Sequence, residues 1–200
     1  MTKKIFITLS IIALFASCGT RGNNNNTFDE GVVINGVRWA TRNVDAPGTF
    51  AANPESAGMF YQWNRQRGWA AGDRRVIGWD NSRPAGDTWL RVNDPCPPGW
   101  RVLTQAELQR LVNAGSTWTE FRGVEGRLLG TAPNQFFLPA VGLRAWQNGR
   151  LHNVGTRGTY WSSSLYRTNI HVISLYFYNS SVGVGGFGRT VGYSVRCVAE

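Results

Sequence analysis

The C-terminal segment constrains the fold most, because it uses few of the twenty residue types. Residues 165–195 contain no Lys, Glu, Gln, Met, Trp, Pro or Ala, and Tyr, Ser, Gly, Val, Asn, Thr and Arg dominate. This composition is typical of short strands joined by turns. It is also typical of binding surfaces, where Tyr supplies rigid contact area and Ser, Gly and Asn supply adaptable hydrogen bonds. The rest of the chain has to decide between a plain β-region and a binding surface.

The N-terminus looks like a bacterial lipoprotein signal. Two lysines precede an apolar run over residues 5–15, and two small residues precede Cys18. A basic start, an apolar stretch too short to span a membrane as a mature helix, and small residues at its end are typical of a secretory signal. We therefore expect residues 1–17 to be a signal peptide and Cys18 to be lipidated. The alternative is a plain signal peptide with Cys18 as an ordinary thiol.

The remaining chain is expected to form a tether and one domain. Residues 18–30 are polar and poor in apolar side chains, which is typical of a flexible tether. Residues 31–200 are about 170 residues, a length that suits a single domain. Their order of short elements is expected to give an α+β fold with short antiparallel sheets, two short helices and long Trp- and Gly-rich loops.

The charge of the mature chain comes from arginine alone. Both lysines lie in the signal, which leaves 19 Arg against 12 Asp and Glu, a net charge of +7. Nucleic-acid-binding proteins usually cluster Lys and Arg on one face, whereas these arginines are spread evenly. We expect solvated surface charge and planar hydrogen-bonding groups, and no nucleic acid as partner.

Two cysteines, Cys96 and Cys197, remain after the signal. In an exported chain an even pair normally forms a disulfide, and two buried thiols are the alternative. The chain has only two histidines, His152 and His171, and no close Cys/His spacing. We therefore expect no metal site and no cofactor.

Local patterns predict the positions of several elements. A hairpin with an Asn35-Gly36 turn is expected over residues 31–39, with residues 40–44 continuing its second strand. A short helix is expected over residues 54–64, and a loop region over 65–95. A capping box at Thr104 and Glu107 predicts a helix that ends near Gly115. The remaining expectations are a strand over 136–143, a hairpin turn at residues 148–149, and closing strands at 160–161, 171–178 and 192–198.

Six ordered motifs resemble one family of exported proteins. They read GVRWATRN (36–43), GMFYQWN (58–64), DPCPPGWRVLTQAEL (94–108), FLPAVGLR (137–144), GTYWSSS (158–164) and GYSVRCV (192–198). Together they resemble the Fibrobacter succinogenes major paralogous domain, which has a C-type-lectin-like fold. The resemblance implies a bridge between Cys96 and Cys197. We also expect Trp39, Trp63, Trp100 and Trp161 to pack the core, since they lie inside these motifs.

The chain also resembles the variable lipoproteins diversified by diversity-generating retroelements. In those systems adenines of a template are copied with errors, often at AAC codons. Such codons cannot become Lys, Glu, Gln, Met or Trp, and these five residues are absent from 165–195. Strand alternation places Leu175 and Phe177 on a core face and the Ser/Tyr side chains on an exposed face, with residues 183–190 as a loop beside it. The expected ligand-binding residues are Tyr166, Arg167, Thr168, Asn169, His171, Ser174, Tyr176, Tyr178, Phe187 and Thr190.

The sequence favours binding over catalysis. Ser162 to Ser164 lack the context of a nucleophile elbow, and Glu107 has a helix to cap. The calcium-binding strings of true C-type lectins are absent from the sequence. We expect an outer-membrane lipoprotein, facing the cell surface or the periplasm, that is not an enzyme and binds a protein or glycan on a cell, phage or host surface. The alternatives are a fimbrial or cell-surface assembly component with a fixed interface and a calcium-independent glycan-binding protein.

Overall fold

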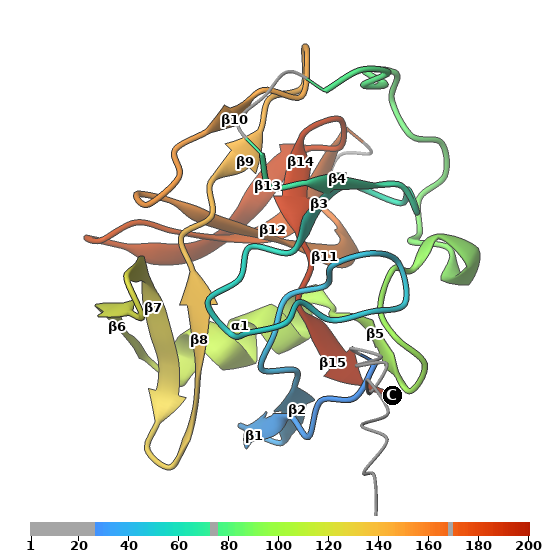
Figure 1. Ribbon diagram of the computed structural model, residues 1–200. Helices are drawn as coiled ribbons and strands as arrows, with labels where there is room; N and C mark the ends of the chain where they lie inside the picture. Colours follow the sequence, from blue (N-terminus) through green and yellow to red (C-terminus); the bar gives the residue numbers. More distant parts are fainter. Residues whose placement is uncertain (1–26, 73–75, 168–169) are drawn as a thin grey trace, which may run out of the picture.

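The fold is mixed α+β, with mostly antiparallel sheets and, among the described residues, a single α-helix (Figure 1). The computed structural model describes residues 27–72, 76–167 and 170–200. The expected signal peptide and the lipidation site at Cys18 lie outside them. The first sheet has the order β1 (Val32–Ile34), β2 (Val37–Trp39), β15 (Cys197–Ala199) and β5 (Trp100–Val102).

The second sheet is the largest and carries the C-terminal segment. Its order is β10 (Leu151–His152), β9 (Leu143–Arg144), β14 (Gly192–Ser194), β11 (Gly158–Leu165), β12 (His171–Phe177) and β13 (Val182–Gly188). β3 (Met59–Gln62) pairs with β14 and with β4 (Gly68–Ala70). All pairs in it are antiparallel except β11 with β14. The third sheet is β6 (Ser116–Phe121), β7 (Val124–Thr131) and β8 (Asn134–Pro139).

The N-terminal hairpin is confirmed, but its second strand ends earlier than expected. Asn35 and Gly36 both have positive φ (48° and 78°), as a two-residue hairpin turn requires. β2 ends at Trp39, and just beyond it the Asp29 carboxylate accepts hydrogen bonds from both the backbone N–H (3.0 Å) and the hydroxyl of Thr41.

The helix predicted over residues 54–64 is wrong, and the segment contains β3 instead. Gly58 has a φ of 65°, which is not helical, and a Cβ there would lie 2.1 Å from the carbonyl oxygen of Val44, so the position requires glycine. The strand that follows is buried on both faces, with Phe60, Tyr61 and Gln62 almost fully inaccessible. A strand buried on both faces lacks the alternation that distinguishes strand from helix in a sequence.

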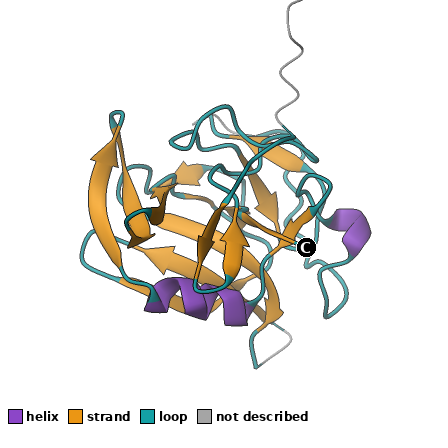
Figure 2. Ribbon diagram, turned by 90° about the horizontal axis from the view of Figure 1, so that it is seen from below, coloured by secondary structure: helices purple, strands orange, loops and turns teal. Residues whose placement is uncertain are grey.

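The capping-box helix is confirmed as α1 (Gln105–Asn113). The Thr104 hydroxyl accepts from the Glu107 backbone N–H, and the Glu107 carboxylate accepts from the Thr104 backbone N–H at 2.7 Å. Burial acts to raise the pKa of Glu107, but hydrogen bonds from Arg101 and Thr104 hold it below its usual value. Leu108 and Leu111 are buried beneath the helix, which lies on one side of the central strands (Figure 2). Where the structure describes it, the predicted loop region over 65–95 is mostly irregular and contains β4 and a 3₁₀ turn at Arg91–Asn93.

The later hairpins divide into predicted and unpredicted ones. The turn at residues 148–149 is confirmed, because β9 pairs with β10 across it. The predicted strand over 136–143 is split into β8 and β9. The β6–β7 hairpin was not predicted. Its turn is Arg122-Gly123, with φ of 51° and 80°, which lacks the Asn-Gly or Asp-Gly signal of such turns.

Two hydrophobic clusters form the core. One packs α1 against β12 through side chains such as Leu108, Ile173 and Leu175. The other lies across the large sheet and includes Val172 and Tyr193. The four tryptophans expected in the core are all buried: Trp39, Trp63, Trp100 and Trp161.

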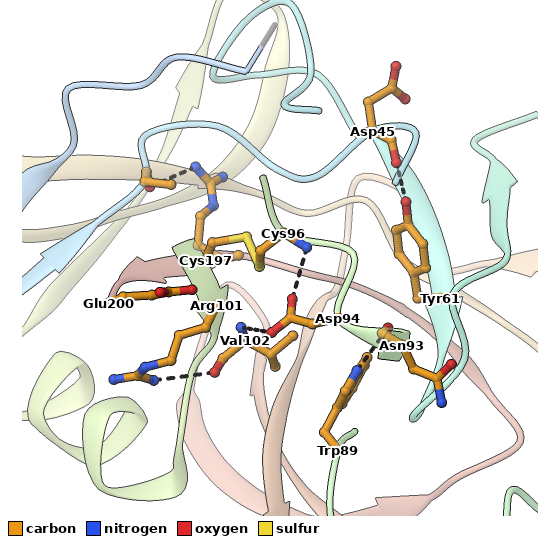
Figure 3. Close-up of a disulfide and its surroundings, with 12 residues drawn as sticks. Asp45, Tyr61, Trp89, Asn93, Asp94, Cys96, Arg101, Val102, Cys197 and Glu200 are labelled. Carbon is orange, nitrogen blue, oxygen red and sulfur yellow. Dashed lines mark hydrogen bonds between the residues drawn. A yellow bond between two sulfur atoms is a disulfide. The ribbon is translucent and has the colours of Figure 1, made fainter. Parts of the chain in front are cut away.

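The predicted disulfide between Cys96 and Cys197 is present, with an S–S distance of 2.06 Å (Figure 3). It joins the loop before β5 to the start of β15, which also pairs with β2. The Asp94 carboxylate accepts from the backbone N–H groups of Cys96 (2.9 Å) and Val102 (3.0 Å). Burial raises the pKa of Asp94 despite these bonds.

In the described ranges no helix is long and apolar enough to cross a membrane.

Candidate ligand-binding face

The expected binding residues gather around β12 and β13, at the edge of the large sheet. β12 lies between β11 and β13, and β13 is the outermost strand. The two strands pair without a bulge, from His171 opposite Gly188 to Phe177 opposite Val182. The loop predicted for residues 183–190 is therefore wrong, because most of it is this strand. Its four glycines disguise a strand in the sequence, since Gly is depleted in strands.

Strand alternation divides the predicted residues between the two faces of the sheet. Ser174 and Tyr176 share one face, whereas His171 has the parity of Ile173, which packs toward α1. A Cβ at Gly186 would lie 2.8 Å from the ring of Tyr166, and Gly186 is the register partner of Ile173. Tyr166 and His171 therefore lie on the face opposite to Tyr176. The single exposed face expected from the sequence is wrong.

Ser174 is not exposed as predicted, since its accessible fraction is 0%. Its neighbour Val172 belongs to the second hydrophobic cluster, and Ile173 and Leu175 belong to the first. β12 is thus buried on both faces over this stretch. The Ser174 hydroxyl has no hydrogen-bond partner in the described part of the chain.

Three of the predicted residues do form one cluster. The Tyr176 ring lies edge-on to Phe187, with 5.6 Å between centroids, and edge-on to Tyr178 at 6.4 Å. Two residues that sequence reasoning missed complete it. Tyr193 lies edge-on to Phe187 at 5.8 Å, and the guanidinium carbon of Arg157 lies 5.4 Å and 5.5 Å from the ring centroids of Tyr178 and Phe187. We call these five residues the aromatic–arginine cluster.

The glycines of β13 make room for the cluster. A Cβ at Gly183 would lie 2.8 Å from the Tyr176 hydroxyl, and one at Gly185 would lie 3.3 Å from the same ring. The ring of Tyr176 therefore covers backbone that bears no side chains. In the sequence, the alternation of Gly183 and Gly185 is the feature that could indicate a strand face covered by a ring.

The side chains of the aromatic–arginine cluster differ in how deeply they are buried. Tyr176, Tyr178, Phe187 and Arg157 are half-buried, and Tyr193 is 2% exposed. Burial raises the pKa of Tyr193, and the charge of Arg157 partly offsets this effect. The cluster therefore has a fixed base and a partly accessible rim, a geometry suited to recognising flat, polar or anionic groups.

The other predicted residues lie outside the cluster. Arg167 is exposed, and Thr190 is half-buried with its carbonyl accepting from Gln62 Nε2 at 2.9 Å. Thr168 and Asn169 lie outside the described residues. Within the described ranges no group of three or more His, Cys, Asp or Glu side chains is placed to hold a metal ion.

Comparison of the chain with family models, with curated proteins and with solved structures finds no match.

Proposed function

We propose that this chain is an exported, lipid-anchored protein that binds a macromolecular ligand through the aromatic–arginine cluster. Its mechanism is shape and hydrogen-bond complementarity with aromatic anchors rather than catalysis. The ligand in this proposal is a protein or glycan on a cell, phage or host surface. The protein is placed in the outer membrane, at the cell surface or on the periplasmic face, with Cys18 as its lipid anchor.

The observation that carries the proposal is the aromatic–arginine cluster itself. Tyr176, Tyr178 and Phe187 present partly accessible rings on well-paired strands, beside the guanidinium of Arg157. Tyr and Arg are the residues most enriched among those that dominate binding energy. Rings held by a rigid sheet lose little conformational entropy on binding.

A C-type-lectin-like fold and membership of the Fibrobacter succinogenes major paralogous domain are part of the proposal. Three features support them. The first and last strands of the domain lie in one sheet, where Trp39 is opposite Val198. The Cys96–Cys197 bridge closes that end. The tryptophans of the matching motifs are buried, as scaffold residues should be.

Diversification of the face is the part of the proposal that sequencing can test directly. The gene would be sequenced deeply across a passaged population, with substitutions counted for each codon. Retroelement-driven variation predicts changes at adenine-templated positions within codons 165–191, while codons 94–108 stay fixed. Changes spread evenly along the gene, or none at all, would rule diversification out.

An assembly component with a fixed interface is the second candidate, and the edge of β13 favours it. Among described residues, β13 pairs only with β12, and no backbone hydrogen bond reaches its outer edge. An open strand edge can accept a strand from another chain. An invariant 165–191 region together with concentration-dependent assembly would favour this candidate.

Binding would be tested with the full chain, displayed as a multivalent reagent on arrays of glycans and of surface proteins. Tyr176→Ala should reduce any retained signal at least tenfold, because a central aromatic anchor is worth about 2 kcal/mol or more. Trp146→Ala is the matched control, since Trp146 is an exposed aromatic (51%) outside the cluster. Equal loss from both variants would contradict a site at the cluster. Competition by free sugar would identify the calcium-independent glycan-binding alternative.

A further inference from the structure

Arg157 belongs to the aromatic–arginine cluster, although it precedes residues 165–195, the segment that uses few residue types. It follows the turn that connects β10 to β11, and its backbone is held at both ends. Its N–H donates to the Asn153 carbonyl at 3.0 Å, and its carbonyl accepts from Gly142 at 2.7 Å. The side chain then extends to Tyr178 and Phe187, at 5.4 Å and 5.5 Å from their ring centroids. Its position is therefore set by the scaffold and by two rings.

The guanidinium of Arg157 has no acceptor among residues that the structure describes. Its Nε is buried without a hydrogen-bond partner. Its two terminal nitrogens are not fully buried, and no described group forms a hydrogen bond or an ion pair with them. A guanidinium presents five donors in a rigid planar fork, so this one has unused hydrogen-bonding capacity.

Other inward-facing arginines also have a buried, unpaired Nε, but they use their terminal nitrogens. Arg144, Arg189 and Arg196 are each 3% exposed or less, and each donates to at least two backbone carbonyls. Their guanidinium groups serve the fold. The Arg157 guanidinium donates to none of the described carbonyls and contacts two aromatic rings instead. Its free fork faces the same rings that form the proposed binding face.

We infer that Arg157 is the anion anchor of this face and binds a carboxylate of the ligand, an inference that rests on the proposed function. A planar carboxylate matches the guanidinium fork with two parallel hydrogen bonds. The rings of Tyr178 and Phe187 lie 5.4 Å and 5.5 Å from the guanidinium carbon and lower the local dielectric, which strengthens a charge-assisted bond. One guanidinium suits one negative charge, so a monoanionic carboxylate fits better than a phosphate dianion. The anchor lies outside residues 165–191, so it would stay constant while that face varied.

The test is a titration of the full chain in detergent, with the arginine Nε–H resonances followed by NMR. Benzoate is the first probe, and benzamide is its neutral counterpart of the same shape. We expect benzoate to shift the Arg157 resonance and to bind at least tenfold more tightly than benzamide. Arg157→Gln should abolish benzoate binding, and Arg157→Lys should weaken it at least threefold, because Lys lacks the planar fork. Arg150→Gln, at an exposed arginine in the β9–β10 turn, should leave it unchanged.

Two further arms identify the source of the carboxylate. Glucuronate represents an acidic sugar and N-acetylglutamate an acidic peptide side chain, and the tighter binder names the source. Benzamide binding as tightly as benzoate, inorganic phosphate binding more tightly than either carboxylate, or an equal loss in Arg150→Gln would overturn the inference. The wild-type comparison of benzoate with benzamide keeps the test valid even if Arg157→Gln does not fold.

The inference and the proposed function can fail separately. Carboxylate binding at Arg157, with no macromolecular signal that depends on Tyr176, would leave the anchor standing and remove the proposed function. A Tyr176-dependent signal with no carboxylate response would do the reverse.

Discussion

At the scale of single residues, the buried arginines are used as hydrogen-bond donors rather than as surface charges. Arg196 is 1% exposed and donates to the carbonyls of Ala40 (3.2 Å) and Phe137 (3.3 Å). Burial lowers its pKa to about 10, so it remains charged at neutral pH. The even spread of arginine along the sequence predicted solvated charge, and for this residue only the planar hydrogen-bonding role is confirmed. It ties the end of the N-terminal hairpin to β8.

Arg196→Met should lower the free energy of unfolding by about 2 to 3 kcal/mol. Met fills much of the volume but leaves the carbonyls of Ala40 and Phe137 without their charged donor. Urea unfolding at neutral pH measures the loss. Arg150→Met, at an exposed arginine, is the control and should change stability by less than about 0.5 kcal/mol. Similar losses in the two variants would show that the buried hydrogen bonds contribute little.

Three buried tyrosines predict a loss of stability in alkali. Burial raises the pKa of Tyr61, Tyr160 and Tyr193, that of Tyr160 to about 12. Unfolded tyrosine releases its proton near pH 10, so above pH 10 the native state holds more protons than the unfolded state. Stability must then fall as pH rises from 10 toward 12. Burial also lowers the pKa of Arg127, Arg144, Arg189 and Arg196, so the native state loses these protons before the unfolded state does, which opposes the fall.

Each of the three tyrosines contributes up to about 1.4 kcal/mol per pH unit to this fall above pH 10. Urea unfolding at a series of pH values from 8 to 11.5 gives the slope. Tyr193→Phe removes one of the three protons, so its slope should be shallower by about 1.4 kcal/mol per pH unit. An identical slope in wild type and variant would show that Tyr193 is not held protonated by burial.

At the scale of elements, the pairing of β11 with β12 depends on a glycine. Gly158 lies opposite Phe177, and a Cβ at Gly158 would come within 2.0 Å of the Phe177 ring. Phe177 is fully buried between Tyr160 and Trp118, so it cannot move aside. An aromatic ring that covers a strand glycine is a recognised way to stabilise a position without a side chain.

Gly158→Ala should therefore destabilise the protein by about 1 to 3 kcal/mol or more, as overpacking does in well-packed cores. Urea unfolding of the wild type and the variant measures the change in the free energy of unfolding. The control is Gly188→Ala. Gly188 lies at the end of β13, where an added Cβ meets nothing within 4 Å. That control should be neutral or slightly stabilising, because Ala lowers the entropy of the unfolded chain. Loss of stability in Gly188→Ala alone would contradict the steric explanation.

The elements also show which parts of the fold the sequence could predict. Elements fixed by neighbouring residues could be predicted: the capping box at Thr104 and the positive-φ turn at Asn35-Gly36 both have the predicted geometry. Elements fixed by contacts between distant residues could not be predicted. β3 lacks the alternation of a strand because it is buried on both faces, and β13 lacks strand-forming residues because its glycines accommodate the ring of Tyr176. For the same reason Arg157 was missed, since only the tertiary fold brings it to Tyr178 and Phe187.

At the scale of the whole molecule, the domain is closed by contacts between its beginning and its end. β15 pairs with β2 on one side and with β5 on the other. The backbone N–H of Ala40 donates to the Cys197 carbonyl at 3.0 Å, and that of Val44 donates to the Val195 carbonyl at 3.0 Å. Such pairings are remote in sequence and cost loop-closure entropy when they form. The bridge between Cys96 and Cys197 spans 101 residues, so it removes much of that entropy from the unfolded chain.

Opening this bridge should reduce the free energy of unfolding by about 4 to 5 kcal/mol, as the chain-entropy model gives for a loop of this length. Comparison of urea unfolding with and without a reductant measures the loss. A cross-link that acts mainly on the unfolded state also predicts a steeper denaturant dependence after reduction, because the freed chain exposes more surface. The double variant Cys96→Ala/Cys197→Ala should behave like the reduced protein, with a small further loss since Cys197 is fully buried. A loss with an unchanged denaturant slope would instead place the effect in the native packing around β15, and the closure of the domain would then depend on its strand pairing alone.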